Sequence, residues 1–321
     1  MSSRFPGRRP YTAGPVLDPQ TPTRRRRRLT LAAALPSALL AALLFAPAAS
    51  AGWFYPRADG SPNAENIQTL YILIALIALP IFLVVEGLLI YSMIKFRARK
   101  GRVAAQIHGN TQLEIGWTVG AAVILVFITV VTFVMLGDIK NPAASDIDAD
   151  GNPVSASISR QYASTDQPPP PEGSASMNIV VDGQQYVWRF QYPGEGEDAV
   201  FAYTDMYVPI GMTVTLDVTA DDVAHSWWIP QLGGKMDAVP GYTNKTWFKI
   251  PLDALPEGED RVVYDGQCAE LCGRGHADML ARVIGLPYDD WVEWRDRKAQ
   301  EIQQAREAAA ETREQLEGAG R

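Results

Sequence analysis

The side chains best suited to bind a metal lie close together near the end of the chain. Both cysteines of the protein, Cys268 and Cys272, are four residues apart. An imidazole and a thioether follow within the next seven residues, at His276 and Met279, and a second imidazole, His225, stands 43 residues before Cys268. Thiolates, a thioether and imidazoles together favour copper over magnesium, calcium or manganese.

Other sites fit these residue types less well. Zinc accepts two cysteines and two histidines, but the thioether of Met279 adds nothing to a zinc site. A single blue copper needs one cysteine rather than two. A local disulfide remains the alternative to a metal at this cysteine spacing. Two thiolates close enough to be shared between metals favour a dinuclear copper centre.

Period-two alternation after residue 177 predicts the strands that position these residues. The alternating aromatics, expected on one strand face, are Tyr186, Trp188, Phe190 and Tyr192. Shorter strands are expected around residues 246–250, 261–264 and 279–286. Residues 177–287 are therefore predicted to form a small antiparallel β-sandwich or barrel.

Two apolar segments ahead of this domain are long enough to cross a membrane. Residues 70–94 contain one charged residue, Glu86, and residues 115–136 contain none. At about 1.5 Å per residue, each segment can span a hydrocarbon core of about 30 Å. Residues 65–137 are thus predicted to be a transmembrane hairpin. A carboxylate at Glu86 indicates a partner subunit, a polar path along the helix, or a protonated side chain without function.

Two groups of basic residues bear on this hairpin: one lies in the loop between its apolar segments, and the other lies near the start of the chain. The basic residues of the loop between the apolar segments are Lys95, Arg97, Arg99, Lys100 and Arg102. The positive-inside rule places this loop in the cytoplasm and the chain after residue 136 outside it. Five arginines at 24–28, an apolar stretch and the small residues Ala49-Ser50-Ala51 predict a signal peptide over residues 1–51, with an uncleaved anchor helix as the alternative.

The remaining segments differ in composition. Residues 138–176 are rich in Pro, Ser, Asp and Ala and predict a linker that is stiff at Pro168–Pro171. Residues 288–321 predict a charged helical tail. Between residues 177 and 285, 16 Asp and Glu outnumber 7 Lys and Arg. Such an acidic surface disfavours nucleic acid and attracts basic partners, unless it serves solubility alone.

The cysteine-rich segment resembles the copper A site of subunit II of cytochrome c oxidase, of the bacterial type. The motif reads Cys268-Ala-Glu270-Leu-Cys272-Gly-Arg-Gly-His276-Ala-Asp-Met279, with His225-Ser-Trp upstream. The resemblance covers about residues 65–295 and implies a cupredoxin-like Greek-key fold in which both cysteine sulfurs bridge two coppers. It implies that His225 and Met279 complete one copper, and that His276 and the main-chain carbonyl of Glu270 complete the other. The Glu270 carboxylate would then be free to bind magnesium or manganese at the boundary with the catalytic subunit.

The same resemblance implies a function and a location. The chain would accept electrons from cytochrome c at the copper pair and pass them to the haem-copper subunit I, in a complex that includes subunit III. It would lie among lipids of the bacterial plasma membrane, as the electron-accepting part of a proton-translocating oxidoreductase. Oxygen would be reduced in another chain. A quinol oxidase subunit II, which lacks the copper ligands, and a copper chaperone or assembly protein are the alternatives.

Two further segments resemble the family, one with a departure. Residues 108–118 resemble the start of the second transmembrane helix, where Glu114 would lie near the mouth of a proton path; a glutamate there also suits the helix dipole. Residues 183–188 stand where the family has Q-W-x-W, with Tyr186 in place of the exposed tryptophan that receives the electron. The candidates for receiving the electron in this chain are Tyr186, Trp188, Trp227 and Trp228.

Overall fold

The fold is described from a computed structural model in which residues 57–98, 101, 109–154, 169–194 and 199–319 are placed. The predicted signal peptide, residues 1–51, lies outside the described residues and stays a prediction. Three of the loop's basic residues, Arg99, Lys100 and Arg102, lie outside them as well.

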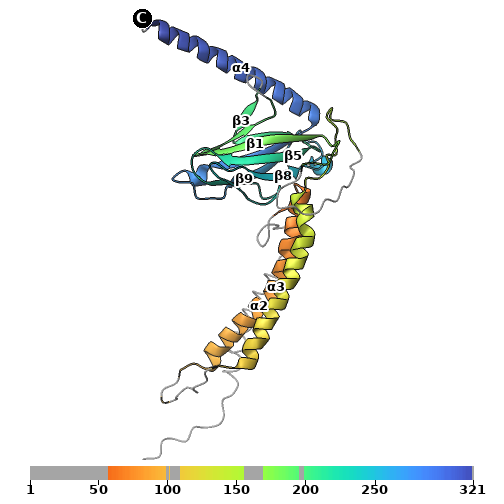
Figure 1. Ribbon diagram of the computed structural model, residues 1–321, viewed down its shortest axis with the longest axis vertical. Helices are drawn as coiled ribbons and strands as arrows, with labels where there is room; N and C mark the ends of the chain where they lie inside the picture. The colour runs from red at the N-terminus through yellow and green to blue at the C-terminus, as the bar shows by residue number, and fades with distance from the viewer. Residues whose placement is uncertain (1–56, 99–100, 102–108, 155–168, 195–198, 320–321) are drawn as a thin grey trace, which may run out of the picture. The chain divides into compact units, whose positions relative to one another are not determined.

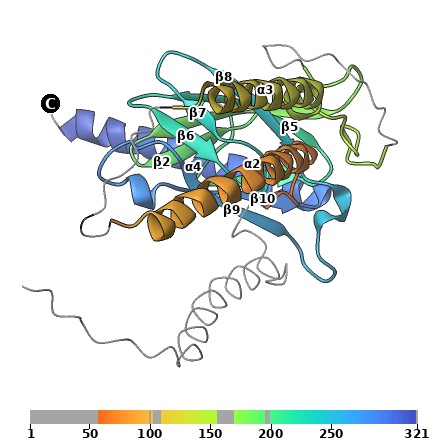
Figure 2. The same cartoon turned by 90° about the horizontal axis from the view of Figure 1, so that it is seen from below.

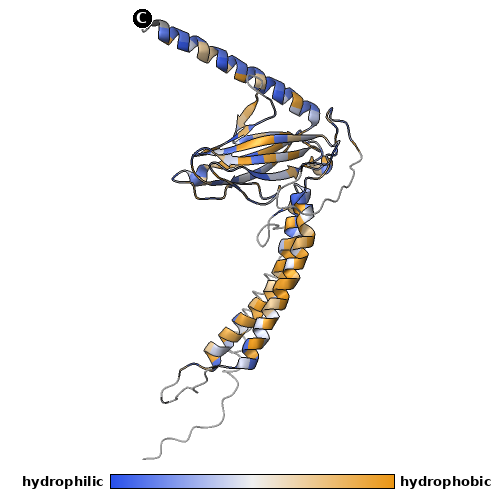
Figure 3. Cartoon of the chain, in the orientation of Figure 1, coloured by the Kyte–Doolittle hydropathy of each residue, from blue (hydrophilic) through white to orange (hydrophobic). Residues whose placement is uncertain are grey.

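Two long helices form the predicted hairpin. Helix α2 spans Pro62–Lys95 and helix α3 spans Thr111–Lys140, and both are long and apolar enough to cross a membrane (Figure 1). Hydrophobic residues make up most of both helices (Figure 3). Asn110 caps α3, because its side chain accepts hydrogen bonds from the backbone N–H of Gln112 and of Leu113. Both helices are longer than the predicted apolar segments, 70–94 and 115–136, because polar residues at both ends are also helical.

The strands of the following domain form two five-stranded sheets. One sheet has the order β3 (Phe201–Tyr203), β2 (Val187–Gln191), β1 (Ser176–Gln184), β5 (Thr213–Ala220) and β8 (Asn244–Lys249). The other has the order β4 (Asp205–Pro209), β10 (Leu280–Leu286), β9 (Val262–Cys268), β6 (His225–Trp228) and β7 (Met236–Ala238). Strands β6 and β7 are seen side by side in Figure 2. The predicted two-helix hairpin followed by a β-sandwich is confirmed.

The expectation of an antiparallel sandwich is wrong for two strand pairs. Strand β1 runs parallel to β5, and β10 runs parallel to β4. Between the members of each pair the chain crosses to the other sheet and returns. Such a crossover lets two strands meet in the same direction, which a tight hairpin turn cannot do.

The inward faces of the sheets form one apolar core. Trp188 and Phe190 of β2 are fully buried, and Tyr192 just beyond it is 3% exposed. Tyr186, expected on the same strand face, is 37% exposed. It lies in the two-residue turn between β1 and β2, where the alternation of the strand ends. The turn therefore removes one of the four aromatics from the core.

Hydrogen bonds connect the outer ends of the two helices to strand β8. Asn63 Nδ2 donates to the carbonyl oxygen of Trp247 over 2.7 Å, and the indole Nε1 of Trp247 donates to the carbonyl oxygen of Ile139 over 2.9 Å. Ser61 Oγ accepts from the backbone N–H of Lys249. Both helices thus contribute partners to the same strand.

Residues 141–154, which their composition assigns to a linker, pack against the sandwich. Ile147 is 2% exposed and belongs to the core. The Lys249 ammonium, whose side chain is 10% exposed, donates to Asp146 Oδ1 over 2.7 Å and to the carbonyl oxygen of Ala144 over 3.0 Å. A buried lysine needs such partners, so this segment is part of the folded domain.

The C-terminal helix α4 spans Tyr288–Ala319, as expected of the charged tail. It begins against the sandwich: Trp291 Nε1 donates to the carbonyl oxygen of Tyr207, and the ring of Trp294 stacks on that of Tyr207 with centroids 4.6 Å apart. Ile302 is 8% exposed. Most of the later residues of α4 are hydrophilic (Figure 3). Only the first half of the helix therefore adds to the core.

The Lys249–Asp146 ion pair gives a test of how residues 141–154 are held. Replacing Asp146 with alanine is expected to lower the free energy of unfolding by about 2–3 kcal/mol, because the buried ammonium of Lys249 loses its charged partner. Asp217→Ala is the matched control, because it removes the partner of Lys245, which is 53% exposed on the same strand, and should cost about 0–1 kcal/mol. Chemical denaturation of the purified chain in detergent measures both changes. Equal losses would contradict a structural role for Asp146.

Candidate metal centre

Neighbouring strands bring three of the predicted ligands to one edge of a sheet. His225 is the first residue of β6, and Cys268 is the last residue of β9. These strands pair directly, with Trp227 opposite Cys268. Met279 stands just before β10, and its carbonyl oxygen accepts from the backbone N–H of Cys268 over 2.9 Å. The ends of three adjacent strands therefore meet at one place.

The loop between β9 and β10 carries the other predicted ligands. It contains Cys272 and the short 3-10 helix η4 at His276–Asp278. Gly273 has a φ of 132°, and a Cβ atom there would lie 2.7 Å from the hydroxyl of Tyr186. The backbone N–H of Arg274 donates to the same hydroxyl over 3.0 Å. Glycine thus lets the ligand loop pass directly against Tyr186.

The thiols and imidazoles converge. The Sγ atoms of Cys268 and Cys272 are 3.9 Å apart, and both cysteines are free. Nδ1 of His225 lies 4.0 Å from Sγ of Cys268, whereas Nδ1 of His276 lies 3.7 Å from Sγ of Cys272. Each imidazole thus approaches a different sulfur.

The thioether and one main-chain oxygen complete the cluster. Met279 Sδ is 3.9 Å from Sγ of Cys272, and the carbonyl oxygen of Glu270 is 3.2 Å from Sγ of Cys268. The side chain of Glu270 is exposed. All six residues singled out in the sequence are therefore in one cluster, with Glu270 contributing its carbonyl and directing its carboxylate to the surface.

Most of the cluster is shielded from water. The cysteines are 4% and 5% exposed, and His225 and Met279 are fully buried. Burial and the neighbouring Cys268 raise the pKa of the Cys272 thiol to about 11. Two buried, adjacent thiols resist losing their protons unless a cation takes their place. The burial of the two thiols therefore favours metal binding over free thiolates.

The arrangement does not fit a single tetrahedral zinc bound by both cysteines and both histidines. The ligands of a single tetrahedral zinc lie at about 2.0–2.3 Å from it, hence within about 4 Å of one another. Among the described residues, the group of ligand atoms within 4.8 Å of one another holds His225, Cys268 and Cys272 but not His276. One ion therefore does not collect both imidazoles and both thiols in this arrangement.

A carboxylate that the sequence analysis missed lies behind His225. Asp222 Oδ1 is 2.9 Å from His225 Nε2, and its carboxylate also accepts from the backbone N–H of Val223 and of Gln185. Burial opposes ionisation, but the hydrogen bonds from His225, Gln185 and Val223 hold the pKa of Asp222 below its usual range. The position of Asp222, three residues before the proposed ligand His225, was the feature of the sequence that could have predicted this contact.

The four candidates for receiving the electron differ in exposure. Trp188 is fully buried and Trp227 is 3% exposed, whereas Tyr186 is 37% exposed. Trp228 is partly buried, with the Lys235 ammonium 4.5 Å from the centre of its ring. Tyr186 thus combines exposure with contact to the ligand loop.

The two membrane-region glutamates differ in setting. Glu114 Oε1 accepts from the backbone N–H of Asn110 over 3.3 Å, a contact that stabilises the start of α3. Its place in a proton path stays a prediction. Glu86 is partly buried on α2.

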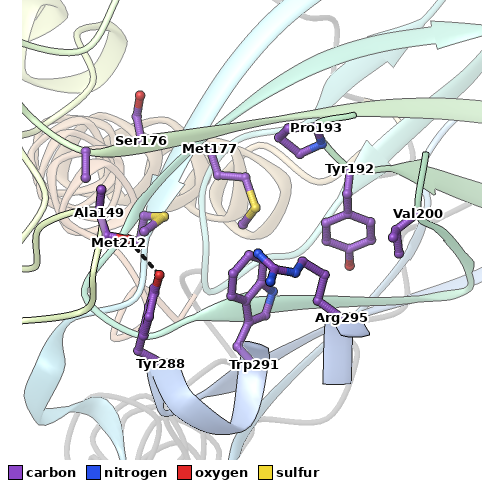
Figure 4. A pocket seen from close by; sticks show the side chains of 11 residues that line it. Ala149, Ser176, Met177, Tyr192, Pro193, Val200, Met212, Tyr288, Trp291 and Arg295 are labelled. Atoms are coloured by element: carbon purple, nitrogen blue, oxygen red, sulfur yellow. Dashed lines mark hydrogen bonds between the residues drawn. The ribbon is translucent and has the colours of Figure 1, made fainter. Parts of the chain in front are cut away.

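A separate cavity lies where α4 meets the sandwich. It has a volume of about 250 Å³, and its lining includes Tyr192, Met212, Trp291 and Arg295 (Figure 4). The hydroxyl of Tyr288 at its edge donates to the carbonyl oxygen of Ala149, which is the dashed line in Figure 4. No residue of the sulfur and imidazole cluster lines it, so it is distinct from the candidate metal centre.

Two family models match the chain. The model for "Cytochrome C oxidase subunit II, periplasmic domain" matches residues 198–285, and the model for "Cytochrome C oxidase subunit II, transmembrane domain" matches residues 48–135. The two-helix membrane anchor and the extracytoplasmic position of the sandwich, both expected from the sequence, are thereby confirmed.

Curated relatives agree with the family models. The cytochrome c oxidase subunit 2 of Alkalihalophilus pseudofirmus is 33% identical over 252 residues, covering 78% of this chain and 63% of the relative. The chain thus spans less than two thirds of that protein. The probable cytochrome c oxidase subunit 2 of Rickettsia bellii is 30% identical, covering 75% of this chain and 81% of the relative.

Among solved structures, the periplasmic domain of subunit II of cytochrome oxidase from Bradyrhizobium japonicum is similar to part of the chain. It is 27% identical, with a TM-score of 0.35, and covers 40% of this chain and 97% of that domain. By its relatives and the two family models, the chain belongs to the cytochrome c oxidase subunit II family.

Proposed function

We propose that the chain receives electrons from cytochrome c at a dinuclear copper A centre and passes them to the haem-copper catalytic subunit of an oxidase. The observation that carries this proposal is the approach of the Cys268 and Cys272 sulfurs to 3.9 Å, without a disulfide and each beside an imidazole nitrogen. When bound, the copper pair supplies a one-electron redox centre shared between two metals. Reduction of oxygen to water, with proton translocation, takes place in another chain.

The protein's own part is to hold the ligands still. His225, Cys268 and Met279 are attached to strand ends, and the strands are held by the ladder between β6, β9 and β10. The fully buried Trp188 packs edge-on against the His225 ring, with centroids 5.8 Å apart. Close packing resists displacement. The ligand positions therefore change little between redox states, which keeps the rearrangement energy of electron transfer small.

Exposed acidic residues around the centre favour a basic electron donor. Those on the strands and loops that carry the ligands are Asp221, Asp222, Asp237, Asp265, Glu270 and Asp278. Such a surface speeds the approach of a cationic protein, and the effect weakens as salt rises. The relatives are cytochrome c oxidase subunits by name, and cytochrome c is the donor we propose.

The tip of the ligand loop suits contact with the catalytic subunit. Leu271 is 77% exposed between Glu270 and Cys272. An exposed leucine beside a free carboxylate fits an interface that buries apolar surface and shares a magnesium or manganese ion at Glu270. Subunit III and membrane lipid complete the proposed surroundings.

The alternative functions are less well supported. A quinol oxidase subunit II has no copper ligands, whereas all six residues of the motif cluster here. A copper chaperone needs an accessible metal that it can release. Four of the ligand side chains are at most 5% exposed, which favours a resident centre.

Metal analysis combined with electron paramagnetic resonance tests the copper proposal directly. The purified oxidase complex should contain two coppers in this subunit that share one unpaired electron when oxidised. Cys268→Ser and Cys272→Ser should each abolish that signal, because each removes a sulfur that both coppers need. One zinc in the site, or a Cys268–Cys272 disulfide in the complete complex, would refute the proposal.

Substitution of Tyr186 tests the electron-receiving surface. Tyr186→Ala should lower kcat/KM for cytochrome c about tenfold, the effect of losing an exposed aromatic worth about 1.4 kcal/mol at an interface. Tyr186→Trp should keep most of the activity, because it restores a large exposed ring. Steady-state oxidation of cytochrome c, with copper content measured in the same samples, checks this. Tyr203→Ala, at a tyrosine 50% exposed on edge strand β3, is the control, and an equal loss there would contradict the assignment.

A further inference from the structure

The two ring nitrogens of His225 have different neighbours. Nδ1 faces the sulfur of Cys268 at 4.0 Å, and Nε2 lies 2.9 Å from Oδ1 of Asp222. The imidazole itself is fully buried, whereas the Asp222 side chain is 35% exposed. A single hydrogen bond thus connects a buried metal-facing ring to a carboxylate at the surface.

That arrangement selects one form of the imidazole. An ionised carboxylate only accepts hydrogen bonds, so the proton of a neutral His225 must be on Nε2. The lone pair on Nδ1 is then directed to the sulfur side, where a metal would lie. A carboxylate on the far nitrogen also makes an imidazole a more basic ligand.

Other contacts fix the ring and the carboxylate in place. A Cβ atom on Gly183 would lie 3.0 Å from Cδ2 of His225, so a side chain there would press on the ring. Asp222 Oδ2 accepts from the backbone N–H of Gln185 over 2.7 Å, and Gln185 Nε2 donates to the carbonyl oxygen of Cys272 over 2.6 Å. Asp222 therefore connects His225 to Gln185, and Gln185 in turn contacts the loop that carries Cys272.

In the part of the chain that the structure describes, no carboxylate partners the second imidazole, that of His276. Among the residues that the structure describes, the hydrogen-bonding contact of the partly buried His276 ring is with Sγ of Cys272. The carboxylate thus acts on one side of the centre only.

We propose that Asp222 is a positioning residue for the metal centre, which holds His225 in the Nε2–H form and lowers the reduction potential of the bound copper. The inference rests on the proposed copper function. A more basic imidazole and a nearby negative charge both stabilise the oxidised, more positive metal, so removing the carboxylate favours reduction.

Asp221 provides a charge-matched comparison. It is the adjacent residue and is exposed, but its carboxylate accepts from Gln184 Nε2 over 2.9 Å rather than from His225. Asp221→Asn and Asp222→Asn therefore remove the same charge from neighbouring positions, and only the second weakens the hydrogen bond to the ligand.

The test uses the purified oxidase complex with either substitution. Redox titration of the copper signal should give a higher midpoint potential for Asp222→Asn than for the unsubstituted complex, and a smaller rise, from the lost charge alone, for Asp221→Asn. Resistance of the copper to a chelator should fall about 10- to 100-fold in Asp222→Asn alone, as for other residues that orient a ligand. Equal changes in both variants, or none in Asp222→Asn, would overturn the inference.

A third variant keeps the test decisive if Asp222→Asn retains no copper. Asp222→Glu preserves the charge on a longer side chain, and it should hold copper more firmly than Asp222→Asn. Equal loss in Asp222→Glu, Asp222→Asn and Asp221→Asn would overturn the inference. Absence of copper from the unsubstituted complex would instead refute the proposed function, so the two failures are distinguishable.

Discussion

The approach of two thiol sulfurs to 3.9 Å inside a folded domain is the constraint on which the rest of this site depends. Cys268 is held by its strand, but Cys272 lies in a loop that must turn back beneath it. Glycine at position 273 and the hydroxyl of Tyr186 make that turn feasible. The aromatic residue at the surface therefore also supports the loop that carries the second sulfur.

Backbone pairing between strands, rather than the length of the side chains, brings the proposed ligands together. The proposed ligands His225 of β6 and Cys268 of β9 come together because these strands are neighbours, although 43 residues separate the two side chains in the chain. Met279 is added by the start of β10, the next strand in the sheet. Since hydrogen-bonded ladders fix strand register, the spacing of the ligand atoms follows from the sheet.

Strand β8 of the β-domain is hydrogen-bonded to the ends of both helices of the membrane anchor. Trp247 and Lys249 of β8 bond with residues at the ends of both helices, through backbone and indole groups. Lys249 also pairs with Asp146 beyond α3. These contacts involve polar groups that are buried and therefore require their partners, so the domain is fastened to its anchor by specific bonds and not only by the chain.

The amino-acid sequence by itself determined the residue types of the metal cluster, both apolar helices and the alternation of the β-domain. Each depends on local pattern: side-chain chemistry, segment length and a period of two. The order of the strands and the packing of the folded domain decided the other features of the structure. The parallel pairing of β1 with β5 and the burial of residues 141–154 join distant parts of the chain through crossovers and packing, which no local periodicity encodes. Tyr186 illustrates the boundary, because alternation placed it on one strand face with Trp188, Phe190 and Tyr192, whereas it lies in the turn and is exposed.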